Sequence, residues 1–408
     1  MRRSVAPWAF LAPYLAVFFV FFLLPALWSA VMSLTDWKIV GTPRLVGFKN
    51  YLRLLTDPLF YTAVKNTLVY TAVIVPLMAL VGLGLALLLN QPLRGRILTR
   101  TCVFASYVVM VSVVGIVWRW VLDPTGAGIV NYYLGRLGLG PYPWLAAPET
   151  AMLSIIIATV WWTAGYNMVM YLAGIQDIPA TLREAVRIDG ASRWQEFWHL
   201  TLPMLRPVTF FVVVMSIAKS FQVFGQVYVM TQGGPSNSTL TIVNYLYVVG
   251  FTWFEMGYAA AIAYALFALL LVITLIQFRM VSREAGGGGF IQARLLVRAG
   301  LYLLMGTVLV LWVGPLLWLV STSLKPEGQI LSLVPRWIPR VFTLENYRDV
   351  LEKYQLIRWG ANSMVVAAGA TILGLAFSIP AAYAFARMRF RGQQWMFLLI
   401  LSTILVPV

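Results

Sequence analysis

Polar side chains interrupt one apolar stretch of the sequence, residues 207–230. They are Ser216, Lys219, Gln222 and Gln226, at spacings that put them within one face of a helix. A lysine near the middle of a bilayer is costly unless it faces protein or water, and a hydroxyl-rich substrate is the natural partner of amides and an ammonium. We therefore predict that this face lines a translocation path, with Asn167 as a weaker candidate. The alternative is that these polar side chains form hydrogen bonds with a neighbouring helix and do not line a path.

The charged segment 177–206 carries the signals of a helix, a turn and a second helix. Pro179 suits a first helical turn, and Gly190 can take the left-handed conformation that ends a helix. Ser192, with Gln195 three residues later, predicts a capping box for the next helix. The segment is therefore predicted to be folded and protruding. A helix resting on lipid headgroups, which the arginines would also suit, is the alternative.

The residue inventory excludes several chemistries. The single histidine, His199, and the single cysteine, Cys102, leave no set for a zinc cluster, an intrachain disulfide or hydrolysis. A P-loop of the form G-x4-G-K-[ST] is missing, so the chain does not bind ATP by that route. We therefore expect no enzyme and no cofactor on this chain.

The composition predicts a protein surrounded by lipid. Of the 408 residues, 61% are hydrophobic and only 11% are charged, which lies outside the range of soluble domains. The formal charge of +16 could suggest nucleic acid, but the arginines lie between apolar stretches and not in one patch. A nucleic-acid partner is therefore not expected.

Stretches of about 18 or more apolar residues mark the predicted membrane spans. The first is too long for a removable signal peptide and is interpreted as a retained span. The spans are placed near residues 8–34, 63–89, 101–122, 151–175, 207–230, 257–278, 299–322, 361–385 and 394 to the end.

Arginines in the short loops predict the orientation, because positive residues stay on the cytoplasmic side. The loops after spans two, four, six and eight are arginine-rich and share one side with Arg2 and Arg3. The N-terminus is therefore predicted to be cytoplasmic. The segment between spans seven and eight mixes both charges and is kept outside, since long loops translocate regardless of charge.

An internal repeat indicates how the chain is organised. Asn50-Tyr51 followed by Asn66-Thr67 recurs as Asn346-Tyr347 followed, at the same interval, by Asn362-Ser363. Six spans separate the copies, so both face the same way. We predict a complete unit at 1–283, a glycine-rich cytoplasmic linker at 284–296, and a partial second unit of about three spans at 297–408 that lacks its own counterpart of 177–206.

The segment 177–206 resembles the signature loop of ABC importer permeases, E-A-A-x3-G-x9-I-x-L-P. Glu184, Ala185, Gly190, Leu202 and Pro203 match at that spacing, whereas Val186 replaces the second alanine and Leu200 the isoleucine. The stretches around Trp161-Trp162 and Tyr228–Thr239 look like the carbohydrate-uptake branch. The resemblance implies an all-α, polytopic fold with one six-span type I permease unit and the first spans of a second.

The resemblance also implies partners and roles. In this family the short helix, here with Glu184, Ala185, Val186, Asp189 and Gly190, docks into a cytoplasmic ATPase. Two ATPase subunits would bind ATP and Mg²⁺, and a partner permease or the remainder of the second unit would complete the path. An extracytoplasmic solute-binding protein would deliver a substrate of the disaccharide, oligosaccharide or glycerol-phosphate type near Gly233, Gly234 and Pro235. The expected location is the inner (cell) membrane.

An ion-coupled secondary transporter is the main rival, since such carriers also show parallel repeats. They usually need an intramembrane acid for the driving ion, whereas every aspartate and glutamate here falls in a predicted loop or at the end of a span. A membrane enzyme is the second rival, but no nucleophile, base or metal set converges. The sequence therefore favours an ATP-driven importer that works by alternating access.

Overall fold

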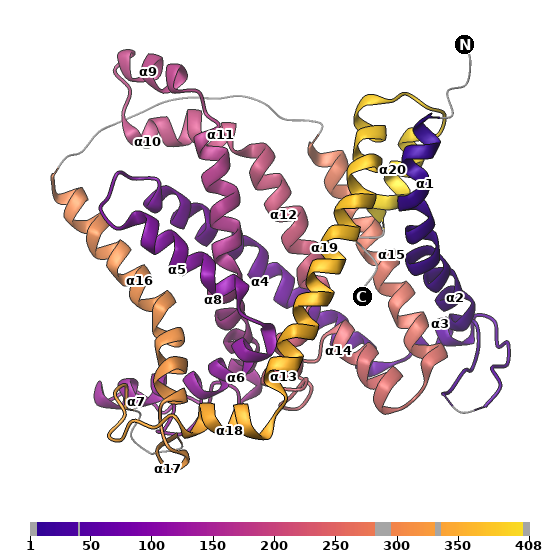
Figure 1. Ribbon diagram of the computed structural model, residues 1–408, viewed down its shortest axis with the longest axis horizontal. Helices are drawn as coiled ribbons and strands as arrows, with labels where there is room; N and C mark the ends of the chain where they lie inside the picture. The colour runs from indigo at the N-terminus through magenta and orange to yellow at the C-terminus, as the bar shows by residue number, and fades with distance from the viewer. Residues whose placement is uncertain (1–5, 40, 282–294, 331–335, 403–408) are drawn as a thin grey trace. The chain divides into compact units, whose positions relative to one another are not determined.

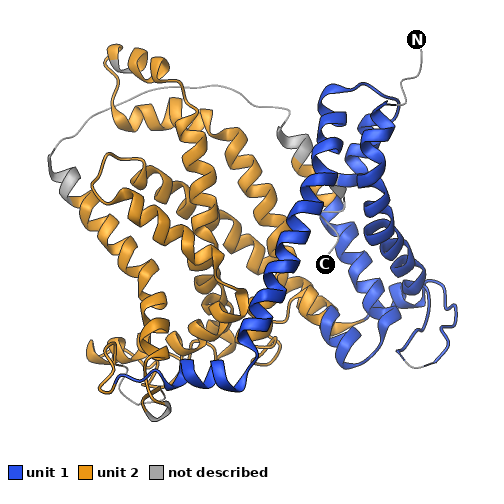
Figure 2. Cartoon of the chain, in the orientation of Figure 1, with its two compact units in different colours: residues 1–56, 246–271, 342–408 blue, residues 57–245, 272–341 orange. Residues whose placement is uncertain are grey.

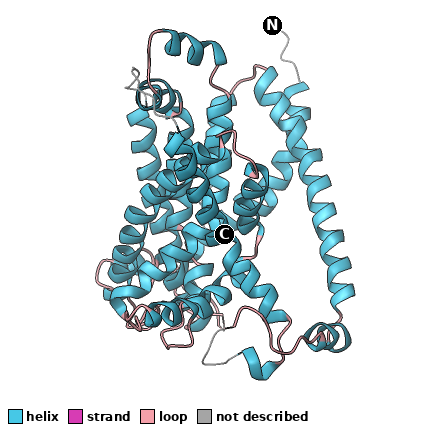
Figure 3. Cartoon of the chain, turned by 90° about the vertical axis from the view of Figure 1, so that its left-hand side faces the viewer, coloured by secondary structure: helices cyan, strands magenta, loops and turns pink. Residues whose placement is uncertain are grey.

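Helices make up most of the part of the chain that the structure describes. The computed structural model describes residues 6–39, 41–281, 295–330 and 336–402. Within these ranges the β structure consists of one isolated bridge, between Thr35 and Leu45. The all-α prediction is confirmed (Figure 3).

Six apolar helices are long enough to cross a membrane, and they match six of the predicted spans. The first crosses as α1 (Ala6–Phe18), a π-helical turn η1 (Phe19–Leu23) and α2 (Leu24–Ser33). The others are α4 (Pro58–Leu89), α8 (Pro148–Gln176), α15 (Met256–Val281), α16 (Leu295–Ser323) and α19 (Leu356–Arg387) (Figure 1). A polytopic membrane protein is therefore confirmed, because these helices are the spans that the apolar runs predicted.

Shorter helices lie between the spans or follow them. They are α3 (Lys49–Leu54), α7 (Ile129–Arg136), α9 (Ala180–Ile188), α10 (Arg193–Glu196), η2 (Phe197–Thr201), α11 (Leu202–Met204), α14 (Ile242–Tyr247), η3 (Val248–Thr252), α17 (Glu327–Ile330), α18 (Glu345–Lys353) and α20 (Gln393–Ser402). The predicted last span begins with α20, and its remainder lies outside the described residues.

Two predicted spans are not continuous helices, which corrects the sequence interpretation. The span at 101–122 consists of α5 (Arg96–Val108) and α6 (Val111–Val121), which meet at an angle of 104°. The span at 207–230 consists of α12 (Arg206–Phe221) and α13 (Gly225–Met230). Apolar composition does not reveal such breaks, because both halves remain apolar.

Side chains from other segments satisfy the carbonyl groups that the breaks release. The indole N–H of Trp162, on α8, donates to the Val109 carbonyl at 2.9 Å. The hydroxyl of Thr241 donates to the Val223 carbonyl at 3.0 Å. A broken backbone is tolerated at membrane depth only with such partners. The breaks are therefore built into the fold.

The described chain forms two compact units (Figure 2). Unit 2 comprises residues 57–245 and 272–341. Within it α4 packs along α8, and α5, α6, α12 and α13 surround this pair, while α16 packs on α5. Buried Tyr70, Ile155 and Met168 lie at its core.

Unit 1 comprises residues 1–56, 246–271 and 342–408. Here α1 packs on α19, with Leu11 buried against Ala381 and Ala384. An ion pair of 2.6 Å joins Arg53 and Glu255. Unit 1 is thus assembled from segments far apart in the sequence.

The repeat predicted from the sequence recurs in the order of elements. A short helix precedes a 32-residue helix both at α3 and α4 and at α18 and α19. Each long helix is followed by a left-handed glycine, Gly95 with φ +83° and Gly392 with φ +85°. The predicted division of the chain at 284–296 stays a prediction, since most of that linker lies outside the described residues.

A close approach of α5 and α8 depends on Gly165. A Cβ atom added there would lie 2.3 Å from the Val103 carbonyl oxygen. We expect Gly165→Ala to push the two helices apart and to cost about 1–3 kcal/mol, as overpacking does. Thermal denaturation of the purified chain in detergent should show a lower midpoint.

Gly84→Ala is the matched control for this prediction. Gly84 lies on α4 with no atom within 4 Å of an added Cβ, so the alanine should leave stability unchanged or raise it slightly. Equal midpoints for the two variants would contradict the proposed close approach.

Candidate functional site

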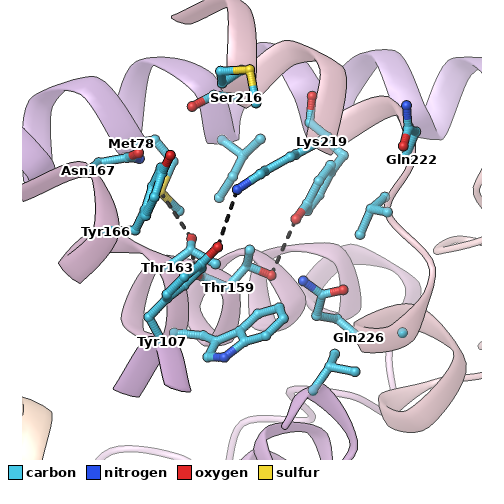
Figure 4. A pocket seen from close by; sticks show the side chains of 18 of the residues that line it. Met78, Tyr107, Thr159, Thr163, Tyr166, Asn167, Ser216, Lys219, Gln222 and Gln226 are labelled. Carbon is cyan, nitrogen blue, oxygen red and sulfur yellow. Dashed lines mark hydrogen bonds between the residues drawn. The ribbon is translucent and has the colours of Figure 1, made fainter. Parts of the chain in front are cut away.

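A cavity of 530 Å³ opens among the membrane helices of unit 2 (Figure 4). It gathers polar and aromatic side chains from α4, α5, α8, α12 and α13. All five residues predicted for the path line it: Asn167, Ser216, Lys219, Gln222 and Gln226. A cavity of this size lies within the range of small-molecule sites, about 300–1,000 Å³.

The prediction that Ser216, Lys219, Gln222 and Gln226 share one helical face is wrong, although all four side chains line the same cavity. Ser216 and Lys219 lie on α12, but that helix ends at Phe221. Gln222 follows its end, and Gln226 lies in the first turn of α13. The four side chains therefore reach the cavity from both sides of a break and not from one helical face.

Lys219 reaches two tyrosine rings in the cavity. Its Nζ lies 4.6 Å from the ring centre of Tyr166 and 5.6 Å from that of Tyr107. The same nitrogen lies 3.5 Å from the Tyr107 hydroxyl (Figure 4). Aromatic faces attract cations, so these rings hold the ammonium inside the cavity.

An aromatic wall on this side of the cavity was missed by the sequence analysis. The rings of Tyr107 and Tyr166 lie 5.1 Å apart, and Trp162 lies 6.4 Å from Tyr107. Trp162 and Tyr166 are four residues apart on α8, a spacing that places them on one helical face and could have been noticed. Tyr107 had no such signal, because it lies beside the unpredicted break.

Buried polar contacts fix the helices around the cavity. The Ser220 hydroxyl donates to Thr71 at 2.9 Å and thereby joins α12 to α4. The Tyr70 hydroxyl donates to Thr159 at 3.3 Å and joins α4 to α8. Buried hydroxyls with partners of this kind rigidify a helix interface. The cavity walls are therefore held in place by specific bonds as well as by apolar packing.

The second predicted feature, the segment 177–206, folds as a protruding helix followed by a turn and further helices. α9 lies at one end of unit 2, opposite α7 (Figure 1). It ends as predicted, with Gly190 in the left-handed region at φ +80°. Ser192 is the N-cap of α10, but its hydroxyl donates to the Gln195 side chain at 2.8 Å and accepts no bond from a backbone N–H of the helix. The capping box is thus corrected to a side-chain pair.

Most of the predicted docking residues are exposed, on α9 or directly after it. Glu184, Ala185, Asp189 and Gly190 are exposed, whereas Val186 is half-buried. Ile188, which the sequence analysis did not select, is 85% exposed, and Leu182 is 41% exposed. Leu202 and Pro203 are half-buried in α11 at the base of the element.

An arginine ties α9 to the end of a membrane helix. Arg183 donates to the carbonyl oxygen of Ile175, in the last turn of α8. Arg100 does the same for α4, donating to the Leu89 carbonyl at 2.6 Å. Cations at helix C-termini are favourable because the last carbonyls carry partial negative charge. The protruding helix is therefore bonded directly to a helix that lines the cavity.

The predicted contact with a binding protein falls in a tight turn after α13. Gly233 is buried, and Gly234 and Pro235 are half-buried. The hydroxyl of Thr239 donates to the Gly234 carbonyl at 2.7 Å. The turn is compact, and its role in such a contact stays a prediction.

This architecture is that of a membrane transport permease: apolar spans, broken helices around a polar cavity and a folded element that protrudes from one end. The chain matches the family of the binding-protein-dependent transport system inner membrane component over residues 78–284. It belongs to this family.

The sequence similarity to curated relatives covers most of the length of each relative. An arabinooligosaccharide transport permease of Bacillus subtilis is 36% identical over 288 residues, which are 70% of this chain and 91% of the relative. A lactose transport permease of Rhizobium radiobacter is 38% identical over 67% of this chain and 93% of its own. An sn-glycerol-3-phosphate transport permease of Yersinia pestis is 34% identical over 69% of this chain and 95% of the relative.

A solved structure has the same fold. A chain in the crystal structure of a bacterial alginate ABC transporter, in complex with an alginate pentasaccharide-bound periplasmic protein, is 25% identical. The TM-score is 0.60, and the match covers 68% of this chain and 95% of that chain. The expectation of a carbohydrate-uptake ABC importer permease is therefore confirmed.

The bond between Trp162 and the break in span three gives a testable consequence. Trp162→Phe keeps an aromatic ring in the cavity wall but leaves the Val109 carbonyl without its 2.9 Å donor. We expect a loss of about 1–3 kcal/mol, the cost of an unsatisfied buried group. A lower thermal midpoint of the purified chain measures it.

Trp118→Phe is the control for ring size. Trp118 is also buried in unit 2, and its indole nitrogen has no hydrogen-bond partner among the described residues. This variant should lose less stability than Trp162→Phe. The opposite order would show that the indole bond does not hold the break.

Proposed function

We propose that this chain carries a sugar from an extracytoplasmic binding protein into the cytoplasm, through the cavity of unit 2, by alternating access. The observation that carries the proposal is α9, a short helix with exposed apolar side chains that is bonded to a cavity-lining helix. The names of the sugar and glycerol-phosphate transport relatives support the substrate class.

The proposed docking surface on α9 consists of Leu182, Ala185 and Ile188. These side chains are exposed, and such apolar contact contributes about 25 cal/mol per Å² buried. A helix of nine residues buries little area, so the contact would bind the ATPase while allowing it to pivot. The ATPase would close on ATP, move α9, and open the cavity outward.

The remaining partners follow from the same proposal. Two ATPase subunits bind ATP and Mg²⁺, and this chain carries neither. The N-terminus and α9 face the cytoplasm, as the distribution of arginines indicates. A second permease, or the remainder of the repeat that begins at about residue 297, completes the path. The exposed apolar side chains of α19, among them Met364 and Val365, support such an arrangement.

An ion-coupled carrier is less well supported. The described aspartates and glutamates lie outside the apolar span helices or, for Glu149, in the first turn of one of them. Among the described residues, no group of histidine, cysteine or acidic side chains could hold a metal ion. We therefore propose that ATP, and not an ion gradient, drives the transport.

Co-purification with the ATPase subunit tests the docking surface. In the double variant Glu184→Arg, Gly190→Arg both changes lie on the exposed side of the element, where new cations oppose apolar burial. We expect the ATPase to be retained by the wild-type chain in detergent and lost, about tenfold or more, from the variant.

Gly138→Arg is the matched control for that experiment. Gly138 is exposed just after α7, left-handed at φ +73° as Gly190 is, and has no atom within 4 Å of an added Cβ. It lies on the predicted outer side and should retain the ATPase. If both variants, or neither, lose the subunit, α9 is not the docking site.

Gly190→Asp tests the coupling in transport. Aspartate and asparagine both tolerate the left-handed conformation that Gly190 adopts at φ +80°, so the backbone should remain folded. We expect the aspartate variant to abolish sugar uptake at normal membrane abundance, and Gly190→Asn to keep a larger part of it. Normal uptake by the aspartate variant would refute the role of this surface.

A further inference from the structure

The cavity contains a positive charge without a balancing negative one. Among the described residues that line it, Lys219 is the one charged side chain, and the polar remainder consists of amides and hydroxyls. The lysine lies thirteen residues beyond Arg206, about 20 Å along α12. That depth is well inside a bilayer whose hydrocarbon core is about 30 Å thick.

A purely structural role accounts for only part of this arrangement. Lys219 lies in the last turn of α12, where the helix dipole favours a cation. This explains why the charge is tolerated at that position. It does not explain why the ammonium points into the cavity toward Tyr107 and Tyr166 (Figure 4). Neither ring carries the full negative charge that an intramembrane lysine normally finds.

The surroundings of Lys219 match a sugar ring that carries an anionic group. Tyr107, Trp162 and Tyr166 offer flat apolar faces beside the ammonium. The amides of Gln222, Gln226 and Asn167 line the same cavity and can both donate to and accept from sugar hydroxyls. A carboxylate or phosphate at the rim of the ring would complete the set with a charge-assisted bond.

We propose that the cavity selects an anionic carbohydrate, whose carboxylate or phosphate pairs with Lys219 while its ring lies against the aromatic wall. This inference rests on the proposed function, since it takes the cavity to be the substrate path. It narrows the substrate from sugars in general to uronic acids or sugar and polyol phosphates.

Equilibrium binding to the full chain, purified in detergent, tests this selection. The probes are an alginate trisaccharide, the same trisaccharide with its carboxyl groups reduced to alcohols, glycerol 3-phosphate and glycerol. Calorimetry and tryptophan fluorescence give the affinities, with Trp162 as a reporter in the cavity wall. We expect an anionic probe to bind about 10- to 100-fold more tightly than its neutral counterpart. Tighter binding of the uronate or of the phosphate identifies which anionic group is preferred.

Variants of Lys219 connect the preference to this side chain. Lys219→Met should remove the preference, Lys219→Arg should keep most of it, and added salt should weaken anion binding to the wild type. Lys65→Met is the matched control, because Lys65 is exposed on α4 and does not line the cavity. It should leave every affinity unchanged. The salt dependence tests the charge even where a variant fails to fold.

Several results would overturn the inference. They are equal or tighter binding of the neutral probes, a preference that survives in Lys219→Met, and the absence of anion binding at millimolar concentration. Co-purification of the ATPase does not depend on the charge of the sugar. A chain that retains the ATPase but prefers neutral probes is therefore an importer permease without anion selection. A chain that binds anions without the ATPase contradicts the proposed function instead.

Discussion

Every backbone carbonyl inside a membrane needs a hydrogen-bond donor, and the described structure is arranged around this requirement. Two spans of unit 2 are broken, and each break would leave a bare carbonyl in an apolar environment. Trp162 donates to Val109 at one break, and Thr241 donates to Val223 at the other. Because these donors come from separate segments, the breaks and the packing of the bundle depend on one another. The cavity lies where the broken helices turn, since Tyr107 and Val111 line it beside one break and Gln222 and Gly225 beside the other.

The same helix serves the cavity and the protruding element. α8 presents Trp162, Tyr166 and Asn167 to the cavity, and its last turn accepts the bond from Arg183. A displacement of α9 is therefore applied to the helix that carries the aromatic wall. This continuity gives the proposed coupling a physical basis, because an α-helix transmits displacement along its axis with little loss.

The sequence predicted most of the spans because a run of about twenty apolar residues has few alternatives to crossing a bilayer. It also predicted the left-handed Gly190, since glycine favours that conformation. It did not predict the breaks at Val109 and Val223, because the donors that make them possible lie about 53 and 18 residues away along the chain. Because the break at Val109 was not predicted, nothing in the sequence indicated that the neighbouring Tyr107 faces the cavity. Lys219 was found because a charge within an apolar run needs an explanation.

The bond between Arg183 and Ile175 has a kinetic consequence. A partial displacement of α9 would stretch it and expose a helix-terminal carbonyl, and it would also pull on the donor that holds the Val109 break. Intermediate positions are therefore higher in free energy than arrangements in which both bonds are intact. Packed interfaces of this kind tend to adopt discrete arrangements rather than deform continuously. Movement through such a structure is expected to occur as rare, rapid jumps between long-lived conformations, with dwell times set by the bonds that α8 makes at Ile175 and at Trp162.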